Sequence, residues 1–108
     1  MTKITLFWGL GGLVGLESQG HSGGGAKGED VVCAAVSSLV QALLVGLRDV
    51  ARAPAHCEID SAIPLIRVRW AEAKARELDL LTRAIALSLK EIASGHAGHV
   101  CVSEVYVS

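Results

Sequence analysis

The sequence lacks the features by which most nucleic-acid-binding proteins are recognised. Aromatic residues make up only 4% of its 108 residues, and 10 lysines and arginines are balanced by 11 aspartates and glutamates. A duplex binder normally carries a basic face, and a single-strand binder carries aromatic side chains on which bases stack. We therefore expect no nucleic-acid partner. The apolar fraction of 51% is sufficient for one core, so residues 1–108 are predicted to form a single domain.

Cysteine is also scarce, and its spacing excludes the common metal sites. Cys33, Cys57 and Cys101 form no CxxC pair, and His96 and His99 near Cys101 have no fourth ligand at a suitable spacing. We expect neither a metal nor a cofactor. An odd number of cysteines without a recognisable signal peptide is typical of free thiols in a reducing compartment, so the sequence predicts a cytoplasmic protein. Cys57 and Cys101 are expected to pack within strands.

Residues 31–47 carry no charge, but this run is at the short limit for a membrane span, which takes about 20 residues. Its apolar residues recur at the spacing of one helix face. Asp30 is a favourable N-cap and Pro54 a helix breaker, so a helix is predicted from about residue 31 to about residue 51. It is apolar on most sides. We expect it to be a core helix covered by a sheet and by a second helix or a partner subunit, with no membrane association.

The rest of the chain predicts short strands and a second helix. Leucines and isoleucines at helical spacing indicate a helix over Glu72–Ala93, which Gly95 ends. A register change is expected in the last strand near Ser103. The order ββαββαβ predicts an α+β fold with a mostly antiparallel sheet. Strands are expected where β-branched and aromatic residues lie between turn signals, at Ile4–Trp8, Leu13–Ser18, Cys57–Asp60, Leu65–Trp70 and Val100–Val107.

The candidate chemistry lies in residues 20–38, which read GHSGGGAKGEDVVCAAVSS. With Asp30 as the cap, Cys33 is the third helical residue, where free N–H groups and the helix dipole favour a thiolate. His21 precedes a glycine-rich loop that is long enough to fold back toward Cys33. A Cys–His pair of this kind performs acyl transfer, and backbone N–H groups beside the cysteine can hold the oxyanion.

Structural roles explain the same residues without catalysis. A cysteine on an apolar helix is usually a small core residue, and Asp30 is above all a cap. Ser37 lies one turn beyond Cys33 on the same face, where it hydrogen-bonds either within a site or back to its own helix. A phosphate site is excluded, because the loop lacks the Gly-Lys-Ser/Thr ending of a P-loop and is followed by Glu29 and Asp30.

The segments Gly20-His21-Ser22-Gly23 and Gly28-Glu29-Asp30-Val31-Val32-Cys33-Ala34-Ala35-Val36-Ser37 together resemble the motif pair of the ribosomal-processing cysteine proteases called Prp. The resemblance extends to the length and element order of the chain. It departs from the family at Gly24 and Gly25, which make the loop more flexible than usual. Residues 54–64 contain no motif that can be aligned.

The resemblance implies a cytoplasmic homodimer without a cofactor. It also implies a peptide substrate, the N-terminal extension of the bacterial large-subunit ribosomal protein twenty-seven. Cys33 is then the nucleophile and His21 the general base, with Asp30 and Ser37 in support. The loop expected to order around the substrate includes Ser22, Gly23, Gly24, Gly25 and Gly28.

Two alternatives stay open on the sequence. One is a non-catalytic ribosome-assembly module in which Cys33 is merely packed. The other is a different thiol enzyme, such as a peroxide-reducing protein, which would need Cys57 or Cys101 close enough to act as a resolving thiol.

Overall fold

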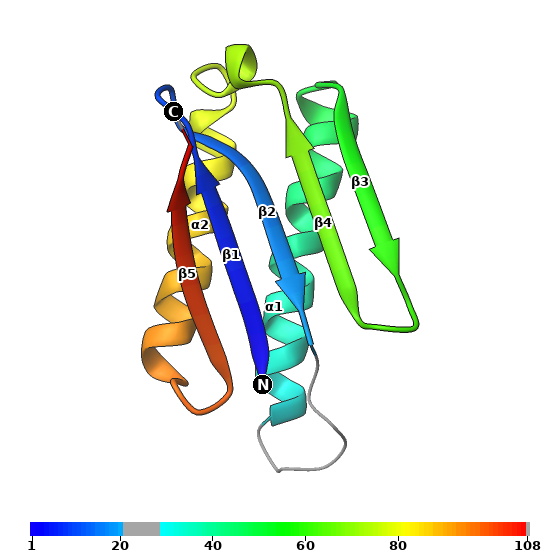
Figure 1. The fold of residues 1–108 in the computed structure, drawn as a ribbon, viewed down its shortest axis with the longest axis vertical. Helices are drawn as coiled ribbons and strands as arrows, with labels where there is room; N and C mark the ends of the chain where they lie inside the picture. The colour runs from blue at the N-terminus through cyan, green and yellow to red at the C-terminus, as the bar shows by residue number, and fades with distance from the viewer. Residues whose placement is uncertain (21–28, 108) are drawn as a thin grey trace.

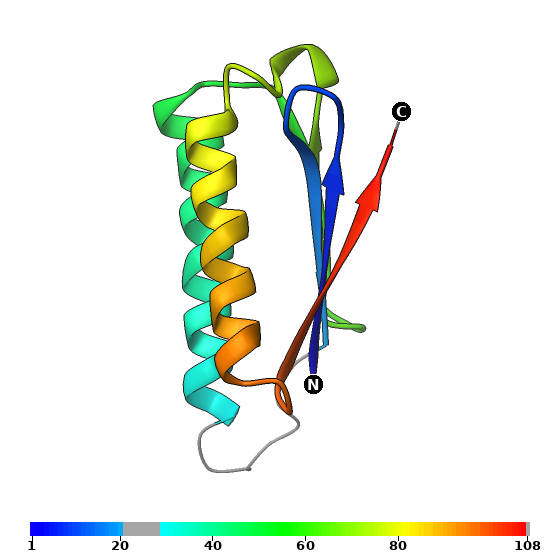
Figure 2. The same cartoon turned by 90° about the vertical axis from the view of Figure 1, so that its left-hand side faces the viewer.

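The computed structural model describes residues 1–20 and 29–107, in which a five-stranded sheet carries two long helices on one face (Figures 1 and 2). The element order is the predicted ββαββαβ. The elements are β1 (Thr2–Trp8), β2 (Leu13–Gln19), α1 (Glu29–Val45), β3 (Ala55–Asp60), β4 (Leu65–Trp70), α2 (Asp79–Gly95) and β5 (Val100–Tyr106).

The strands lie in the order β3-β4-β2-β1-β5. β1 pairs with β2, β2 with β4, and β3 with β4 in antiparallel fashion, whereas β5 runs parallel to β1. The prediction of a mostly antiparallel sheet is therefore confirmed. The β1–β5 pairing is unbroken from Thr2–Val100 to Trp8–Tyr106, so the expected register change near Ser103 was wrong.

The core lies between the sheet and the helices. Ile4, Leu6 and Leu16 alternate with outward-facing residues along β1 and β2 and are completely buried. Helix α1 meets them with a stripe of buried residues at three- and four-residue spacing: Val32, Val36, Val40, Leu43 and Leu47. Figure 2 shows that no helix of the described residues covers the opposite face of the sheet.

Helix α1 continues through one π-helical turn, Gly46–Val50, and so ends close to the predicted position. Among the described residues, Val31–Val50 is the one stretch long and apolar enough to cross a membrane by length and composition, with a mean hydropathy of 1.9. Its buried stripe is typical of a core helix. However, only 33% of this apolar stretch is buried, and Val31 is 74% exposed. Within one copy the sheet and α2 cover the buried stripe only, so covering of the other side would fall to the partner subunit that the sequence left open.

The second helix begins later than predicted. Residues 72–78 form a 3₁₀ turn and an irregular turn, and regular helix starts only at Asp79. This segment packs on the β1–β2 turn. The Glu72 carboxylate accepts a hydrogen bond of 3.2 Å from the Leu10 N–H, and a Cβ at Gly12 would lie 2.7 Å from the Asp79 carboxylate. These contacts replace the first turns of the predicted helix.

Candidate functional site

Cys33 lies near the start of α1, directly beside the start of β1. Its thiol is half-buried, and the Sγ atom is 3.9 Å from the hydroxyl oxygen of Thr2. The Thr2 side chain is itself only 4% exposed. The candidate nucleophile is thus partly accessible to solvent. Its buried side contacts Thr2, the first residue of β1.

Helix α1 begins two residues earlier than predicted. With Glu29 as its first residue, Asp30 lies inside the first turn, so the predicted N-cap role of Asp30 was wrong. Cys33 is the fifth helical residue, and in a regular helix its N–H donates to the carbonyl of Glu29. The unpaired N–H groups belong to the turn before it. The thiol is therefore farther from the positive end of the helix than its predicted position.

The start of β1 is tied to the turn between α2 and β5. The Thr2 N–H donates a hydrogen bond of 2.9 Å to the carbonyl of His99, and the His99 N–H donates to the carbonyl of His96 at 2.9 Å. Figure 1 shows this turn, the N-terminus and the first turn of α1 at the same end of the molecule. The position of Thr2 under the thiol is therefore set by backbone contacts as well as by its own side chain.

Gly20 fixes the direction in which the chain leaves β2. Its backbone has a φ of +89°, and its N–H donates a hydrogen bond of 2.8 Å to the carbonyl of Pro64. A Cβ at this position would lie 2.5 Å from the carbonyl oxygen of Met1. The end of β2 therefore passes close to the start of β1, which also contacts Cys33. A side chain would not fit between them.

The candidate base and the candidate substrate loop lie outside the described residues. These are His21 and the loop residues Ser22, Gly23, Gly24, Gly25 and Gly28. His21 follows Gly20 directly in the chain.

Ser37 is exposed on α1, four residues beyond Cys33 and hence on the same helix face. The neighbouring Ser38 donates a hydrogen bond of 2.9 Å to the carbonyl of Ala34, the kind of bond to its own helix that was considered for Ser37. The exposure of Ser37 leaves its hydroxyl accessible from the side of the molecule on which the Cys33 thiol lies.

The other two thiols are poorly placed to act with Cys33. All three cysteines are free. Cys101 pairs with Lys3, the residue after Thr2, and successive strand residues face opposite sides of the sheet. Cys101 therefore lies on the sheet face away from α1. Cys57 is exposed on β3, contrary to the prediction that it packs within its strand. This arrangement gives no support to a resolving thiol.

No group of three or more His, Cys, Asp or Glu side chains within the described part of the chain could hold a metal ion. His96 is exposed, and His99 contributes its backbone to the β1 contact. The described residues therefore offer no metal chemistry to the candidate site.

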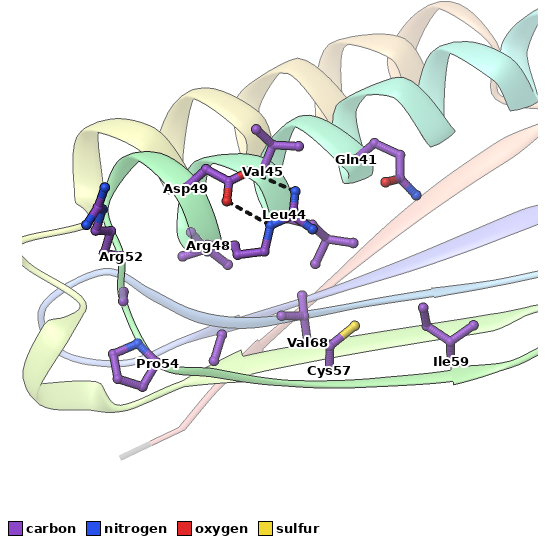
Figure 3. A pocket seen from close by; sticks show the side chains of 13 residues that line it. Gln41, Leu44, Val45, Arg48, Asp49, Arg52, Pro54, Cys57, Ile59 and Val68 are labelled. Atoms are coloured by element: carbon purple, nitrogen blue, oxygen red, sulfur yellow. Dashed lines mark hydrogen bonds and ion pairs between the residues drawn. The ribbon is translucent and has the colours of Figure 1, made fainter.

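An open groove runs between the second half of α1 and the strands β3 and β4 (Figure 3). It has a volume of about 960 Å³ and is lined largely by apolar side chains such as Leu44, Val45 and Ile59, with the Cys57 thiol among them. The ion pair between Arg48 and Asp49, 2.7 Å long, lies at its edge. The sequence did not reveal this groove, because its walls come together only in the folded chain.

The groove follows the same face of α1 as the candidate nucleophile. Leu44 lies eleven residues beyond Cys33, close to three full turns and so on the same side of the helix, and Gln41, eight residues beyond Cys33, is about a quarter turn away from it. With a rise of 1.5 Å per residue, Gln41 is about 12 Å along the helix from Cys33. The apolar surface and the candidate site therefore share one side of the molecule.

Comparison with known proteins adds three findings. A family model described as cysteine protease Prp matches residues 1–101. SMU.848 from Streptococcus mutans has the same fold at 25% identity, with a TM-score of 0.87 over 99% of this chain and 96% of that protein. No curated protein sequence matches.

Two further structures come from Staphylococcus aureus and are described as an essential ribosomal processing protease Prp. One is in complex with a substrate peptide (16% identity, TM-score 0.86), and the other carries a covalently linked product peptide (17% identity, TM-score 0.84). Each covers 97% of this chain and 100% of the S. aureus chain. At these identities the likeness establishes the fold.

Proposed function

The chain belongs to the cysteine protease Prp family and is a cysteine protease, and we propose that it removes the N-terminal extension of the bacterial large-subunit ribosomal protein twenty-seven. The observation that carries the proposal is the family match over residues 1–101, which contains the half-buried Cys33. The description of the S. aureus proteins as ribosomal processing proteases, one of them bound to a substrate peptide, supports the same substrate class.

Cys33 acts as the nucleophile and His21 as its general base. His21 takes the thiol proton, and the thiolate adds to the carbonyl carbon of the scissile peptide bond. The tetrahedral intermediate collapses when His21 gives that proton to the leaving amine, which leaves a thioester on Cys33. Water activated by His21 then hydrolyses the thioester and restores the thiol. The reaction needs no metal and no cofactor.

The position of Cys33 in α1 limits where oxyanion donors can come from. In a regular helix the N–H of Cys33 is already bonded to Glu29, whereas the N–H groups of the first turn are not. Stabilisation of the oxyanion therefore falls to first-turn N–H groups or to the loop, which includes Ser22, Gly23, Gly24, Gly25 and Gly28. In the proposed reaction this loop contacts the substrate, with Asp30 and Ser37 in supporting roles.

The partial exposure of Cys33 favours catalysis over mere packing. A cysteine that only fills the core would be as well buried as Val32 and Val36 on the same helix. Since thiol chemistry requires a reduced cysteine, we assign the protein to the cytoplasm.

We also propose that the protein acts as a homodimer in which a second copy covers the groove of Figure 3. Strand β3 forms one edge of the sheet, and all six of its residues are exposed. Ile59, on the groove side, is 67% exposed. An exposed strand edge offers unpaired N–H and C=O groups to another chain, and a two-fold axis would bury the same patch on both copies.

The substrate assignment is tested with a synthetic peptide that spans the N-terminal extension of the ribosomal protein precursor. Wild type, Cys33→Ala and Cys101→Ala are incubated with it, and the products are identified by mass spectrometry. We expect one cut with wild type and with Cys101→Ala, whose side chain faces away from α1, and no cut with Cys33→Ala. An intact peptide after incubation with folded wild type would refute this substrate.

A further inference from the structure

Thr2 has a polar side chain at a position of β1 that faces the apolar core. It lies on the same face of β1 as Ile4 and Leu6, which are fully buried, and its own side chain is 4% exposed. Burying a hydroxyl costs free energy unless it is hydrogen-bonded. Valine would fill nearly the same volume in the same extended backbone without that cost. A hydrogen bond to a neighbouring group would offset this cost.

The neighbouring group is the Cys33 sulfur. The distance between Thr2 Oγ1 and Cys33 Sγ is 3.9 Å, at the long end of the range for a hydrogen bond to sulfur, and the two residues come from different elements. Thr82 provides a contrast. It is the other fully buried threonine among the described residues, and its hydroxyl has no hydrogen-bond partner there. The contact with Cys33 is thus particular to Thr2.

We propose that Thr2 is a positioning residue for the protease reaction, whose hydroxyl donates a hydrogen bond to the Cys33 sulfur and stabilises the thiolate that attacks. The inference rests on the proposed function, in which Cys33 is the nucleophile. In the neutral pair either atom can donate, but a thiolate has no proton, so the hydroxyl must then be the donor. A hydrogen bond to a charged acceptor is stronger than a neutral one. The contact therefore favours the thiolate over the thiol.

The backbone around Thr2 makes the contact rigid. Its N–H bonds to the carbonyl of His99, and it pairs with Val100 on β5. Neither contact uses the side chain. Substitution of the hydroxyl can therefore be tested without removing what holds the strand end in place.

The test is the rate at which iodoacetamide alkylates Cys33, measured by mass spectrometry across pH. The variants are Thr2→Val and Thr2→Ala, which lack the hydroxyl, and Thr2→Ser, which retains it. The matched control is Thr82→Val, the same chemical change at a buried threonine with no contact to Cys33. A short cysteine-containing peptide added to each sample serves as the reference for alkylation, and thermal unfolding confirms that each variant is folded.

We expect Thr2→Val and Thr2→Ala to slow alkylation of Cys33 about tenfold at neutral pH, with rates that converge on wild type at high pH where every thiol is ionised. Thr2→Ser should stay within about twofold of wild type, and Thr82→Val should match it, because only a hydroxyl beside the sulfur matters. In peptide cleavage, kcat should fall in the hydroxyl-free variants with KM unchanged.

A wild-type pH profile in folded Thr2→Val or Thr2→Ala would overturn the inference. So would a folded Thr2→Ser as slow as Thr2→Val, because the effect would then come from packing. Alkylation needs no substrate. If wild type leaves the precursor peptide intact while alkylation still depends on the Thr2 hydroxyl, the substrate assignment fails and the role of Thr2 stands.

Discussion

The N–H of Gly20 donates a hydrogen bond of 2.8 Å to the carbonyl of Pro64, which ties the last described residue before His21 to the turn between β3 and β4. Gly20 adopts a φ of +89°, which side-chain-bearing residues rarely adopt, and a Cβ would lie 2.5 Å from the carbonyl oxygen of Met1. The chain can therefore enter the segment that carries the candidate base along this path only with glycine at position 20.

We predict that Gly20→Ala impairs catalysis more than it impairs folding. The left-handed conformation costs a non-glycine residue about 1–2 kcal/mol, and the clash with backbone adds to this, so the chain should relax by changing its path toward His21. We expect kcat/KM for the precursor peptide to fall at least about tenfold, because small misplacements of a catalytic group are costly.

Gly98→Ala is the matched control, since a Cβ there has no described atom within 4 Å and its φ is unremarkable. It should keep wild-type activity. Thermal unfolding measured in parallel separates the two effects. Activity of folded Gly20→Ala equal to that of Gly98→Ala would show that the path before His21 is not critical.

A second prediction concerns the general base. His21→Gln should lower kcat about 100- to 10,000-fold, the usual contribution of a positioned proton acceptor, and should leave the unfolding temperature unchanged. His96→Gln provides the control, because His96 is exposed and its described hydrogen bonds are made by its backbone. Steady-state cleavage of the precursor peptide measures both. Equal activity of the two variants would assign the base to another residue.

Local patterns predicted most of the sheet, because the alternation of apolar and polar residues and the turn residues can both be recognised within a few neighbouring positions. β4 has the bounds expected for Leu65–Trp70, and β1 and β2 differ from expectation by one or two residues at their ends. The buried stripe of α1 from Val32 to Leu47 follows the three- and four-residue spacing in the sequence. In these elements, local preference and tertiary packing agree.

The features that the sequence did not predict depend on contacts between residues that are distant in the chain. Residues 72–78 form turns where helix was predicted, and there Glu72 contacts Leu10, which is distant in sequence. The Thr2–Cys33 contact requires β1 to lie under the start of α1, and a periodic pattern does not specify this. The motif predicted Cys33 as the nucleophile from the sequence, whereas its contact with Thr2 could be found only from the fold.

A third prediction concerns Thr82 on the buried face of α2. Its hydroxyl is completely buried and has no partner among the described residues. Replacing an unsatisfied buried hydroxyl with a methyl group of similar shape removes a desolvation cost. Thr82→Val should therefore raise the free energy of unfolding by about 1 kcal/mol, as measured by urea denaturation. A loss of stability would show that the hydroxyl has a partner after all.

The fourth prediction tests the proposed homodimer. Ile59 lies on the groove side of the edge strand β3, so a carboxylate at this position would be buried against a second copy without a partner. Ile59→Asp should therefore shift the protein from dimer to monomer in sedimentation equilibrium, with dimer affinity reduced at least about 100-fold.

Leu80→Asp supplies the matched control, because Leu80 is 90% exposed on α2 and does not line the groove. It should leave the dimer intact, which separates loss of a specific contact from the general effect of one added charge. Neither change removes a buried side chain, so both variants should fold.

A monomeric wild type at micromolar concentration would refute the dimer, and so would an Ile59→Asp variant as dimeric as Leu80→Asp. In the second case something other than a second copy would have to cover the apolar groove beside α1. The peptide substrate would then be the occupant to test next, because the proposed nucleophile Cys33 lies on the same side of that helix.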